Sequence, residues 1–325
     1  MLETSMKPSR GVLLDLATID RGDIDLSSLR AVCERWEIHE RTSPGETAAR
    51  IADAELVVSN KVVLDRALLE SAPGLKLVCV AATGTNNLDL EAARELGIAV
   101  TNVTGYATPA VVQHVFALML AHATRLFEYR QAVLDGAWAR SDQFCLLDYP
   151  IRELAGRTLG IVGFGELGRG VAKVAQAFGM RVLAAERPGG PAQPGRVPLA
   201  ELLPQVDVLS LHCPLTETTR NLIGAQELSL MKQDALLINT ARGGIVDEPA
   251  LVYALRRGLI GGAAMDVLTA EPPRDGNPLI DPSIPNLTVT PHTAWASREC
   301  RQRLVGGVAE NIRAFAGGRA CNRVA

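Results

Sequence analysis

Apolar segments of strand length alternate with amphipathic segments along most of this chain, and the alternation occurs twice. In the first third of the sequence, the intervening segments carry apolar residues at i, i+3, i+4 and i+7, as one-sided surface helices do. This pattern predicts a parallel sheet with helices on both faces. The strands expected here cover residues 12–16, 36–40, 55–60, 75–81 and 98–102.

A second alternation begins at Thr158 and continues almost to the end of the chain. It predicts a complete doubly wound fold of the kind that binds dinucleotides. The segment 187–195, RPGGPAQPG, is too rich in proline and glycine for regular structure and is predicted to be a loop. A last helix is expected over about 297–315, ended by Gly317 and Gly318. The strands predicted in this part cover residues 158–163, 181–186, 206–213, 235–241, 261–266 and 287–292.

Between the two alternations lies a helical stretch that starts at Thr108, as a cap, and Pro109, in the first turn, and continues to about residue 134. Its middle, VVQHVFALMLA, is apolar nearly all round, so we expect it to be buried between domains or against a second copy of the chain. Residues 137–153 lose this periodicity and are predicted to form an extended arm or loop. The apolar helix and the arm together predict a homodimer.

Composition excludes several classes of function. A length of 325 residues favours two domains or one elaborate domain. Lys and Arg number 33 against 36 Asp and Glu, no block of like charge occurs, and aromatic residues are only 4%, so neither nucleic acid nor an anionic membrane is an expected partner. No segment approaches the roughly 18 apolar residues of a membrane span, and the opening apolar run is too short for a signal sequence, so we expect a cytoplasmic protein. The six cysteines show no CxxC spacing, so no metal site is predicted and buried thiols are expected.

A glycine-rich motif follows the first strand of the second alternation. Gly163, Gly165 and Gly168 form GxGxxG between a strand and a helix, where they would give a tight turn, a close approach to a pyrophosphate and close packing of helix on strand. The next strand ends at Glu186, and 186 minus 168 gives 18 residues, the spacing expected for a carboxylate that binds the adenosine ribose. Glu186 favours NAD over NADP, whereas the neighbouring Arg187 leaves NADP possible.

Three side chains of complementary chemistry follow later strands of the second alternation. Arg242 follows one strand, Glu271 lies five residues beyond Asp266 at the end of the next, and His292 closes the last. Each alone would be an ordinary surface charge, loop carboxylate or core histidine. The carboxyl ends of parallel strands share one edge of the sheet, where ligands bind. Hydride transfer to a ketone needs a proton donor, a partner that keeps it protonated and a cation for the substrate carboxylate, so these residues predict a dehydrogenase.

The segments GFGELG, LHCPLTETTRNLI, INTARGGIVDEPAL, GAAMDV and TPHTAW occur in this order, and with them the sequence resembles the D-isomer-specific 2-hydroxyacid dehydrogenases. AATGTNN, NVTGYATPAVVQHVFAL, SDQFCLLDYPIREL and HTAWASRECRQRL are most similar to the glycerate dehydrogenase/hydroxypyruvate reductase branch of that family. The family more often has Asp where Glu186 stands, and Glu217-Thr218 differs from its usual Pro-Glu order.

The resemblance implies roles for individual residues. Arg242 would clamp the substrate, and His292, paired with Glu271, would protonate the carbonyl oxygen during reduction. Asp266 would bind the nicotinamide amide. Backbone amides of the loop at Ala82, Thr83 and Gly84 would hold the substrate carboxylate. Further contacts with the cofactor are expected from Glu166, Leu167, His212, Pro214 and Ala241.

Some residues keep two interpretations. Asn60, at the end of the third strand, would contact the terminal hydroxyl of the substrate or form a strand-end turn. His212 would line the cofactor or serve in packing. His114 and His122, in the apolar helix, are interpreted as structural.

The same resemblance implies a discontinuous architecture of two doubly wound parallel-sheet domains with an active-site cleft between them. A flavodoxin-like substrate domain would contain residues 1–103 and 296–325, and a Rossmann cofactor domain would contain residues 104–295. The expected function is NADH-dependent reduction of hydroxypyruvate and glyoxylate, running in reverse on D-glycerate. The alternatives are a dehydrogenase for another 2-hydroxy acid and a non-catalytic, NAD-sensing binding protein of the same fold.

Overall fold

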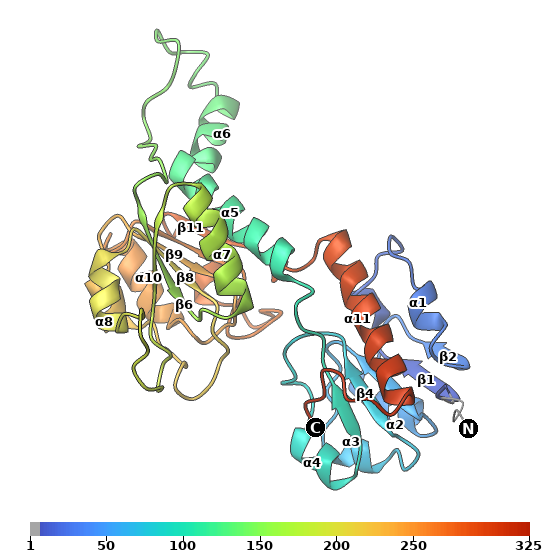
Figure 1. Cartoon of the computed structure of the whole chain (residues 1–325). Coiled ribbons are helices and arrows are strands. Elements are labelled where there is room, and N and C mark those ends of the chain that lie inside the picture. The colour runs from blue at the N-terminus through green and yellow to red at the C-terminus, as the bar shows by residue number, and fades with distance from the viewer. Residues whose placement is uncertain (1–6) are drawn as a thin grey trace. The chain divides into compact units, whose positions relative to one another are not determined.

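The computed structural model describes residues 7–325, and the chain divides into two compact units. The first contains the residues up to Ala107 together with Ala296–Ala325, and the second contains Thr108–Trp295. Each unit is built on its own parallel sheet with helices on both faces (Figure 1). The prediction of two doubly wound parallel-sheet folds is therefore confirmed.

The sheet of the first unit has the strand order β2-β1-β3-β4-β5, with every neighbouring pair parallel, which is the flavodoxin-like arrangement. Its strands are β1 (Arg10–Leu13), β2 (Arg35–Ile38), β3 (Leu56–Ser59), β4 (Leu77–Val80) and β5 (Ala99–Thr101). The helices of this unit are α1 (Ser27–Arg30), α2 (Pro44–Ile51), α3 (Arg66–Glu70), α4 (Leu90–Glu95) and α11 (Arg298–Ala316), with a 3₁₀ turn, η1, at Leu16–Thr18.

Alternate residues of these strands are buried on opposite faces of the sheet. Val12 and Val57 pack in one core with Ile51 of α2, and this core also includes side chains of α3 and α4. Leu13 and Val58 face the other side, where α1 and α11 cover the sheet. Because both faces are covered, the strands are apolar without interruption, and their sequence pattern could predict them.

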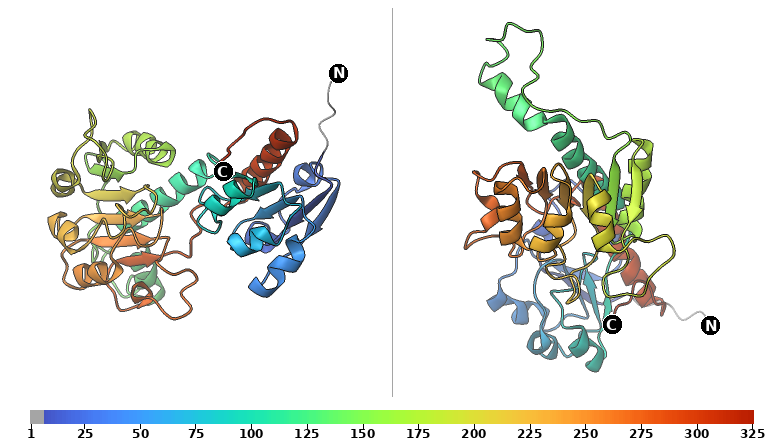
Figure 2. Two further views of the ribbon diagram at one scale, coloured as in Figure 1. Left: turned by 90° about the horizontal axis from the view of Figure 1, so that it is seen from below. Right: turned by 90° about the vertical axis from the view of Figure 1, so that its left-hand side faces the viewer.

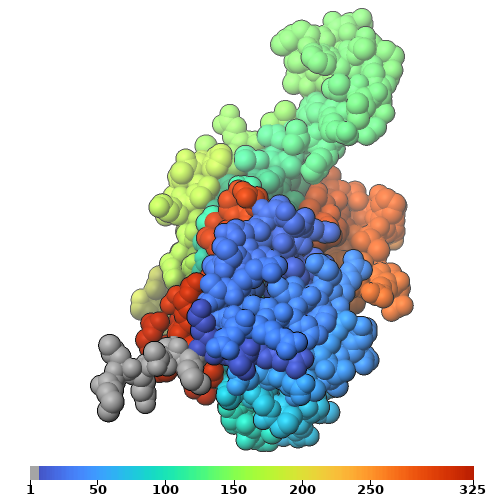
Figure 3. All heavy atoms as spheres, turned by 90° about the vertical axis from the view of Figure 1, so that its right-hand side faces the viewer, coloured from blue at the N-terminus to red at the C-terminus, as the bar shows by residue number. Residues whose placement is uncertain are grey.

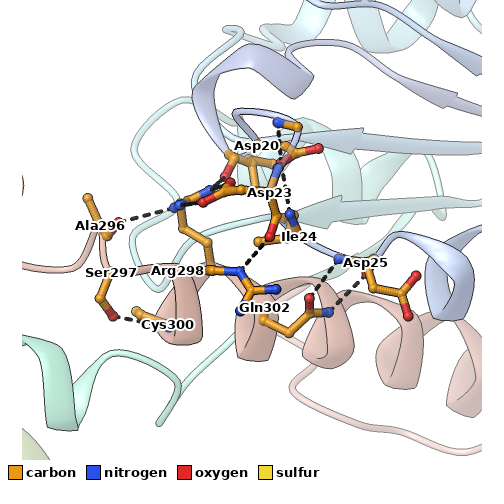
Figure 4. Close-up of polar contacts among 12 residues, drawn as sticks. Asp20, Asp23, Ile24, Asp25, Ala296, Ser297, Arg298, Cys300 and Gln302 are labelled. Atoms are coloured by element: carbon orange, nitrogen blue, oxygen red, sulfur yellow. Dashed lines mark hydrogen bonds and ion pairs between the residues drawn. The ribbon is translucent and has the colours of Figure 1, made fainter.

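Helix α11 is joined to the first unit although it lies at the far end of the sequence. The Ser297 hydroxyl caps it by accepting the Cys300 N–H at 3.2 Å. Figure 4 shows the polar contacts that fix its first turns: Arg298 Nε donates to the Asp23 carbonyl at 2.6 Å, and the side chain of Gln302 makes two hydrogen bonds with the backbone of Asp25. The chain end then pairs with β5, because Val324 N donates to Val100 O at 2.8 Å.

The sheet of the second unit has the order β11-β10-β9-β8-β6-β7. Val197 forms a single parallel bridge with Ala185, directly after β7. A one-residue strand therefore stands where the usual dinucleotide fold has its third strand, and the usual order of that fold is kept. The strands are β6 (Thr158–Val162), β7 (Arg181–Ala184), β8 (Val208–Leu211), β9 (Leu236–Asn239), β10 (Gly262–Met265) and β11 (Leu287–Val289).

The helices of the second unit lie on both faces of this sheet (Figure 1). Helices α5 and α7 pack together on one face, and α9 and α10 pack together on the other. The helices are α5 (Thr108–Thr124), α6 (Leu126–Leu134), α7 (Glu166–Ala177), α8 (Leu199–Leu202), α9 (Ala225–Leu230) and α10 (Glu248–Arg256), with 3₁₀ turns η2 at Leu203–Gln205 and η3 at Pro278–Ile280.

The helical stretch predicted from Thr108 to about residue 134 is divided in two. Arg125 adopts a left-handed conformation (φ 53°), and α5 and α6 meet there at a bend of 58°. The sequence suggested that this helix is buried between domains or against a second copy. Helix α5 is in fact buried mainly against α7, β9 and β10 of its own unit, so its apolar surface does not require a second copy. No single helix in the described part of the chain is long and apolar enough to span a membrane; only the bent pair α5 and α6 reaches that length and hydrophobicity together.

Exposed apolar side chains are concentrated instead on α6 and the irregular segment after it. The right-hand view in Figure 2 and the space-filling view in Figure 3 show residues 126–151, in green, projecting from the body of the second unit. No residue of α6 is buried, and Phe144 is 91% exposed. The sequence predicted an arm or loop over residues 137–153; from here on, we use the arm as the name for residues 126–151, which include α6. Its exposed large apolar side chains are Leu126, Phe127, Val133, Leu134, Trp138, Phe144, Leu147, Tyr149 and Ile151.

Candidate active site

The glycine loop between β6 and α7 has the three local geometries that a dinucleotide site needs. Gly163 has φ 90°, and a Cβ there would lie 2.5 Å from the Cys213 nitrogen. A Cβ at Gly168 would lie 2.3 Å from the Gly163 oxygen, so the helix packs on the strand only because this residue is glycine. At Gly165, by contrast, a Cβ would meet nothing within 4 Å in the described chain. The loop is thus closed on two sides and open on the side where a pyrophosphate would approach.

Helix α7 begins at this open side. Gly165 is its N-cap and has no side chain to accept from the first backbone N–H groups, so those of Glu166 and Leu167 are available to a ligand. The positive end of the helix dipole also favours an anion there. The Glu166 carboxylate accepts a hydrogen bond from the Thr108 hydroxyl at 2.6 Å. The loop therefore fits the pyrophosphate of a dinucleotide.

The residues predicted for the adenosine end lie at the neighbouring strand ends. Glu186 directly follows the β7 bridge residue Ala185, and its carboxylate has no hydrogen-bond or ion-pair partner among residues 7–325, which suits it to accept from a ribose diol. Arg187 next to it is exposed.

His212 and Pro214 follow β8. Nε2 of His212 lies 2.9 Å from the Ser210 hydroxyl, while its Nδ1 is buried without a partner in the described chain. Burial lowers the His212 pKa to about 4, so the ring is neutral and can bond to a bound ligand through Nδ1. Its backbone also packs against Gly163, so His212 serves in packing whatever its role toward the cofactor.

The side chains predicted to act on substrate follow β9, β10 and β11, which are adjacent and parallel. Nδ1 of His292 lies 2.6 Å from Oε2 of Glu271, and Oε1 of the same carboxylate accepts the Leu268 N–H at 2.7 Å. The side chains of His292 and Glu271 are 30% and 32% exposed, so they remain accessible to a small molecule. The structure thus brings together the acid pair that the sequence predicted, at the carboxyl edge of the sheet.

The backbone holds His292 in an unusual conformation. Its φ is 54°, in the left-handed region that is uncommon for a residue with a side chain. The His292 N–H donates to the carbonyl oxygens of Asp266 at 2.8 Å and Thr290 at 3.0 Å. Strain of this kind persists where the surroundings fix the backbone, and it is concentrated at functional sites.

Asp266 is the buried group that fixes this loop. Its carboxylate accepts hydrogen bonds from the Thr290 hydroxyl at 2.5 Å and from the N–H groups of Thr293 and Ala294, both at 2.9 Å. His114 lies 3.5 Å from the same carboxylate and 3.1 Å from the Thr290 hydroxyl. Both oxygens of Asp266 are thus engaged by the loop that carries His292. The predicted contact of Asp266 with the nicotinamide stays a prediction.

Arg242 is positioned by a neighbour that the sequence interpretation missed. The side chain of Asn239, which is fully buried, donates to the Arg242 carbonyl at 2.9 Å and accepts from the Ala241 N–H at 3.0 Å. The next residue, Gly243, lies so close to the loop after β10 that a Cβ would be 1.9 Å from the Leu268 oxygen. Glycine at this position lets the Arg242 loop pack directly on the loop that leads to Glu271.

Glu248 is a second residue that the sequence interpretation missed. Its buried carboxylate accepts from Thr269 N at 2.7 Å and from the Asn277 side chain at 2.8 Å, on either side of Glu271 in the chain. The signal was present, because Glu248 lies inside the INTARGGIVDEPAL segment. Its partners are 21 and 29 residues away, however, and only the fold shows them.

The remaining predicted substrate residues belong to the first unit. The side-chain nitrogen of Asn60 donates to the Thr18 hydroxyl at 3.0 Å, and its backbone N–H donates to the buried Asp15 carboxylate at 2.9 Å. The loop of Ala82, Thr83 and Gly84 follows β4. Its carbonyls at 82 and 83 accept from Val103 N and the Asn102 side chain, whereas its N–H groups have no acceptor among the described residues.

The position of His122, the other histidine of α5, supports its interpretation as a structural residue. His122 packs against Gly262 and lines a small cavity of about 70 Å³ in the second unit. Burial lowers the His122 pKa to about 4. Among residues 7–325, no cluster of His, Cys, Asp or Glu side chains is arranged to hold a metal ion.

A dinucleotide fold whose carboxyl edge carries a histidine–glutamate pair and an arginine defines a nicotinamide-dependent oxidoreductase. Residues 116–294 match the family described as D-isomer specific 2-hydroxyacid dehydrogenase, NAD binding domain. The chain is 48% identical over 291 residues to a glycerate dehydrogenase of Methylorubrum extorquens, covering 90% of this chain and 92% of that protein. It is 37% identical over 320 residues to a hydroxypyruvate reductase of Blautia hydrogenotrophica, covering 96% and 98%.

The crystal structure of the TT0316 protein from Thermus thermophilus is similar over 97% of this chain and 100% of that one, with a TM-score of 0.83 and 37% identity. The chain belongs to the D-isomer-specific 2-hydroxyacid dehydrogenase family, and it is an NAD(P)-dependent oxidoreductase that acts on CH-OH groups. The family resemblance noted in the sequence is confirmed.

Proposed function

We propose that this protein reduces hydroxypyruvate to D-glycerate with NADH, and glyoxylate to glycolate as a second reaction. The observation that carries the proposal is the 2.6 Å contact between His292 and Glu271 at the carboxyl edge of a dinucleotide-binding sheet. The names of the relatives from Methylorubrum and Blautia, which match nearly the whole chain, support this substrate class.

His292 is the proton donor in this proposal. When bound, NADH supplies a hydride to the carbonyl carbon of the 2-oxo acid. Glu271 engages Nδ1 of His292, so Nε2 is the nitrogen left to donate a proton to the carbonyl oxygen. The Glu271 carboxylate accepts from the proton on Nδ1 and holds the ring in one orientation while Nε2 donates. In the oxidative direction the same nitrogen takes the proton back.

Cationic and amide groups hold the substrate. The Arg242 guanidinium binds the carboxylate and carbonyl oxygens, for which its planar donors are suited. The backbone N–H groups of Ala82, Thr83 and Gly84, which have no acceptor in the described chain, bind the carboxylate. Asn60 uses its side-chain nitrogen on Thr18, so its oxygen is the group left to accept from a terminal hydroxyl of the substrate.

The cofactor is held by residues at the carboxyl edge of the second sheet. Glu186 binds the ribose, the glycine loop and α7 bind the pyrophosphate, and Asp266 binds the nicotinamide amide in addition to holding the His292 loop. His212, Pro214 and Ala241 line the site. The unit that ends at Ala107 and resumes at Ala296 is proposed to be the substrate domain, for which the sequence predicted residues 1–103 with 296–325. The unit Thr108–Trp295 is proposed to be the cofactor domain, for which it predicted residues 104–295.

The protein is also proposed to be a cytoplasmic homodimer. On a monomer, the exposed apolar side chains of the arm would remain in contact with water. A second copy of the chain packed against the arm would cover them. All six cysteines are free thiols, which suits a reducing compartment.

A panel of 2-oxo acids tests the function. Consumption of NADH is followed with hydroxypyruvate, glyoxylate, pyruvate and longer 2-oxo acids, and kcat/KM is compared. The proposal requires hydroxypyruvate to give the highest value and the product to be the D isomer of glycerate. A higher value for another acid would indicate a different dehydrogenase, and binding of NADH without turnover of any acid would indicate an NAD-sensing protein.

A further inference from the structure

Arg196, which lies just after the proline- and glycine-rich loop, has an unusual environment. Its guanidinium carbon lies 4.3 Å from the centre of the Phe164 ring, and Phe164 is the second residue of the glycine loop. Nη1 of this guanidinium is buried, and no acceptor lies within hydrogen-bond distance of it in the described chain. A buried, charged donor without an acceptor is unfavourable, so the arrangement points to an acceptor that a ligand brings.

The backbone places Arg196 beside the residue predicted to bind the adenosine ribose. Val197 pairs with Ala185, and the Glu186 N–H donates to the Val197 oxygen at 2.9 Å. Residues one place before and one place after a parallel pair point to the same face of a sheet. Arg196 and Glu186 therefore share a face, and their Cα atoms are about 8 Å apart for ordinary strand spacing and rise.

An ion pair with Glu186 does not account for Arg196. Neither side chain has an ion-pair partner among residues 7–325, and the guanidinium is stacked on Phe164 instead. A second guanidinium, that of Arg169 in α7, donates to the Phe164 carbonyl at 3.2 Å. Two cations thus flank Phe164, although the chain as a whole has a net charge of −3. Each guanidinium offers planar donors of the kind that bind a phosphate.

We propose that Arg196 is a cofactor-specificity residue that binds the 2′-phosphate of NADPH, so that the protein accepts NADPH as well as NADH. The proposal rests on the assignment of Glu186 to the ribose made under Proposed function. A 2′-phosphate would be repelled by the Glu186 carboxylate, and Arg196 supplies the compensating charge with planar donors. The Phe164 ring holds the guanidinium in place before the cofactor arrives, whereas the exposed Arg187 has no such ring against it in the described chain.

Direct binding of the two cofactors to the full chain tests the proposal. The dissociation constants of NADPH and NADH are measured by fluorescence titration for the wild type and for Arg196→Gln, without any 2-oxo acid. We expect Arg196→Gln to weaken NADPH binding by about 10- to 100-fold, the range for a lost charge-assisted hydrogen bond, and NADH binding by less than about threefold. Arg196→Lys keeps the charge but not the planar stack, so its NADPH dissociation constant should lie between those of the wild type and Arg196→Gln.

Lys173→Gln is the matched control, because it removes one exposed positive charge from the second half of α7 and should leave both constants unchanged. Equal weakening of NADPH and NADH in Arg196→Gln would mean that the arginine binds a group common to both cofactors and would overturn the proposal. Unchanged constants for both would also overturn it, leaving Arg196 as a stacking residue only.

A measurement on the wild-type protein tests the proposal even if the Arg196 variants do not fold. Salt screens the attraction between the 2′-phosphate and the Arg196 guanidinium. The affinity for NADPH should therefore fall more steeply with ionic strength than the affinity for NADH. Equal salt dependence would contradict the proposal. Because no substrate is present in either experiment, failure of the hydroxypyruvate assignment would leave both results interpretable.

Discussion

Oε2 of Glu271 lies 2.6 Å from Nδ1 of His292, while Oε1 of the same carboxylate is held by the Leu268 N–H. One carboxylate therefore joins the loop after β10 to the histidine after β11. It leaves Nε2 as the ring nitrogen that can face a substrate, and it places a negative charge beside the ring. Both features suit the proton-donor role proposed for His292.

Glu271→Gln should slow reduction without weakening the binding of NADH. Glutamine nearly keeps the shape of the side chain but carries no negative charge, so the charge-assisted hydrogen bond to Nδ1 of His292 is lost. We expect kcat/KM for hydroxypyruvate to fall by roughly 10- to 100-fold, the range for such a bond, while the NADH dissociation constant stays within about threefold of the wild type. An unchanged kcat/KM, with NADH binding intact, would show that the glutamate does not act through His292.

Arg242→Lys should impair catalysis without weakening the binding of the cofactor. Lysine keeps the charge but loses the planar pair of donors, so kcat/KM for hydroxypyruvate should fall by roughly 30- to 1000-fold, or about 2–4 kcal/mol. The NADH dissociation constant, measured by fluorescence, should change little. Equal losses in both quantities would make Arg242 a cofactor or folding residue.

The strands and the residues that follow them could be predicted from sequence, because parallel strands covered on both faces are apolar throughout and their carboxyl ends share one edge. The break at Arg125 could not, since neither glycine nor proline marks it, and the Asn286 side chain to which Arg125 donates at 3.0 Å lies 161 residues away in the chain. The one-residue strand at Val197 is too short to show any periodicity.

What the side chains that position the site bind could not be predicted from the sequence, for a different reason. Asp266 and Glu248 hold loops that lie 21 to 29 residues away in the chain, and the hydrogen bonds to their carboxylates exist only after the sheet has formed. A sequence motif can mark such a residue as part of a segment, but it does not show what the side chain holds. Arg196 is similar, because its contact with Phe164 spans the glycine loop and the edge of the sheet.

Replacing the most exposed apolar side chains of the arm should dissociate the proposed dimer. Phe144 and Leu147 are 91% and 78% exposed, so changing both to serine removes apolar surface without opening a core. Light scattering at micromolar concentration should give about twice 34.7 kDa for the wild type and about 34.7 kDa for the variant. Tyr253→Ser, at a residue of α10 that is 61% exposed, is the matched control and should stay dimeric. A wild-type chain that is monomeric at this concentration would contradict the proposal.

The protein should lose stability as pH falls from about 6.5 to about 4. Burial lowers the pKa values of His122 and His212 from 6.5 to about 4, so the unfolded chain binds protons in this range that the folded chain does not. Each histidine should contribute a slope of up to about 1.4 kcal/mol per pH unit to the free energy of unfolding. His122→Asn should reduce this slope, as measured by urea denaturation at several pH values. An unchanged slope would indicate that the imidazole of His122 is protonated in the folded protein.

The further loss of stability below pH 4 should be the same in His122→Asn and in the wild type. It comes from carboxylates such as Asp23 and Glu55, whose pKa values are lowered to about 2, Asp23 chiefly by Arg301 and Glu55 chiefly by Lys76. A difference confined to the range from 6.5 to 4 would therefore identify the histidine.

The rate of hydroxypyruvate reduction by His292→Ala, measured across pH together with the NADH dissociation constant, tests the central claim most directly. Loss of a general acid should lower kcat/KM at every pH by roughly 10²- to 10⁴-fold, and NADH binding should stay within about threefold of the wild type. A variant that binds NADH normally and reduces hydroxypyruvate at close to the wild-type rate would contradict the assignment of His292 as the proton donor.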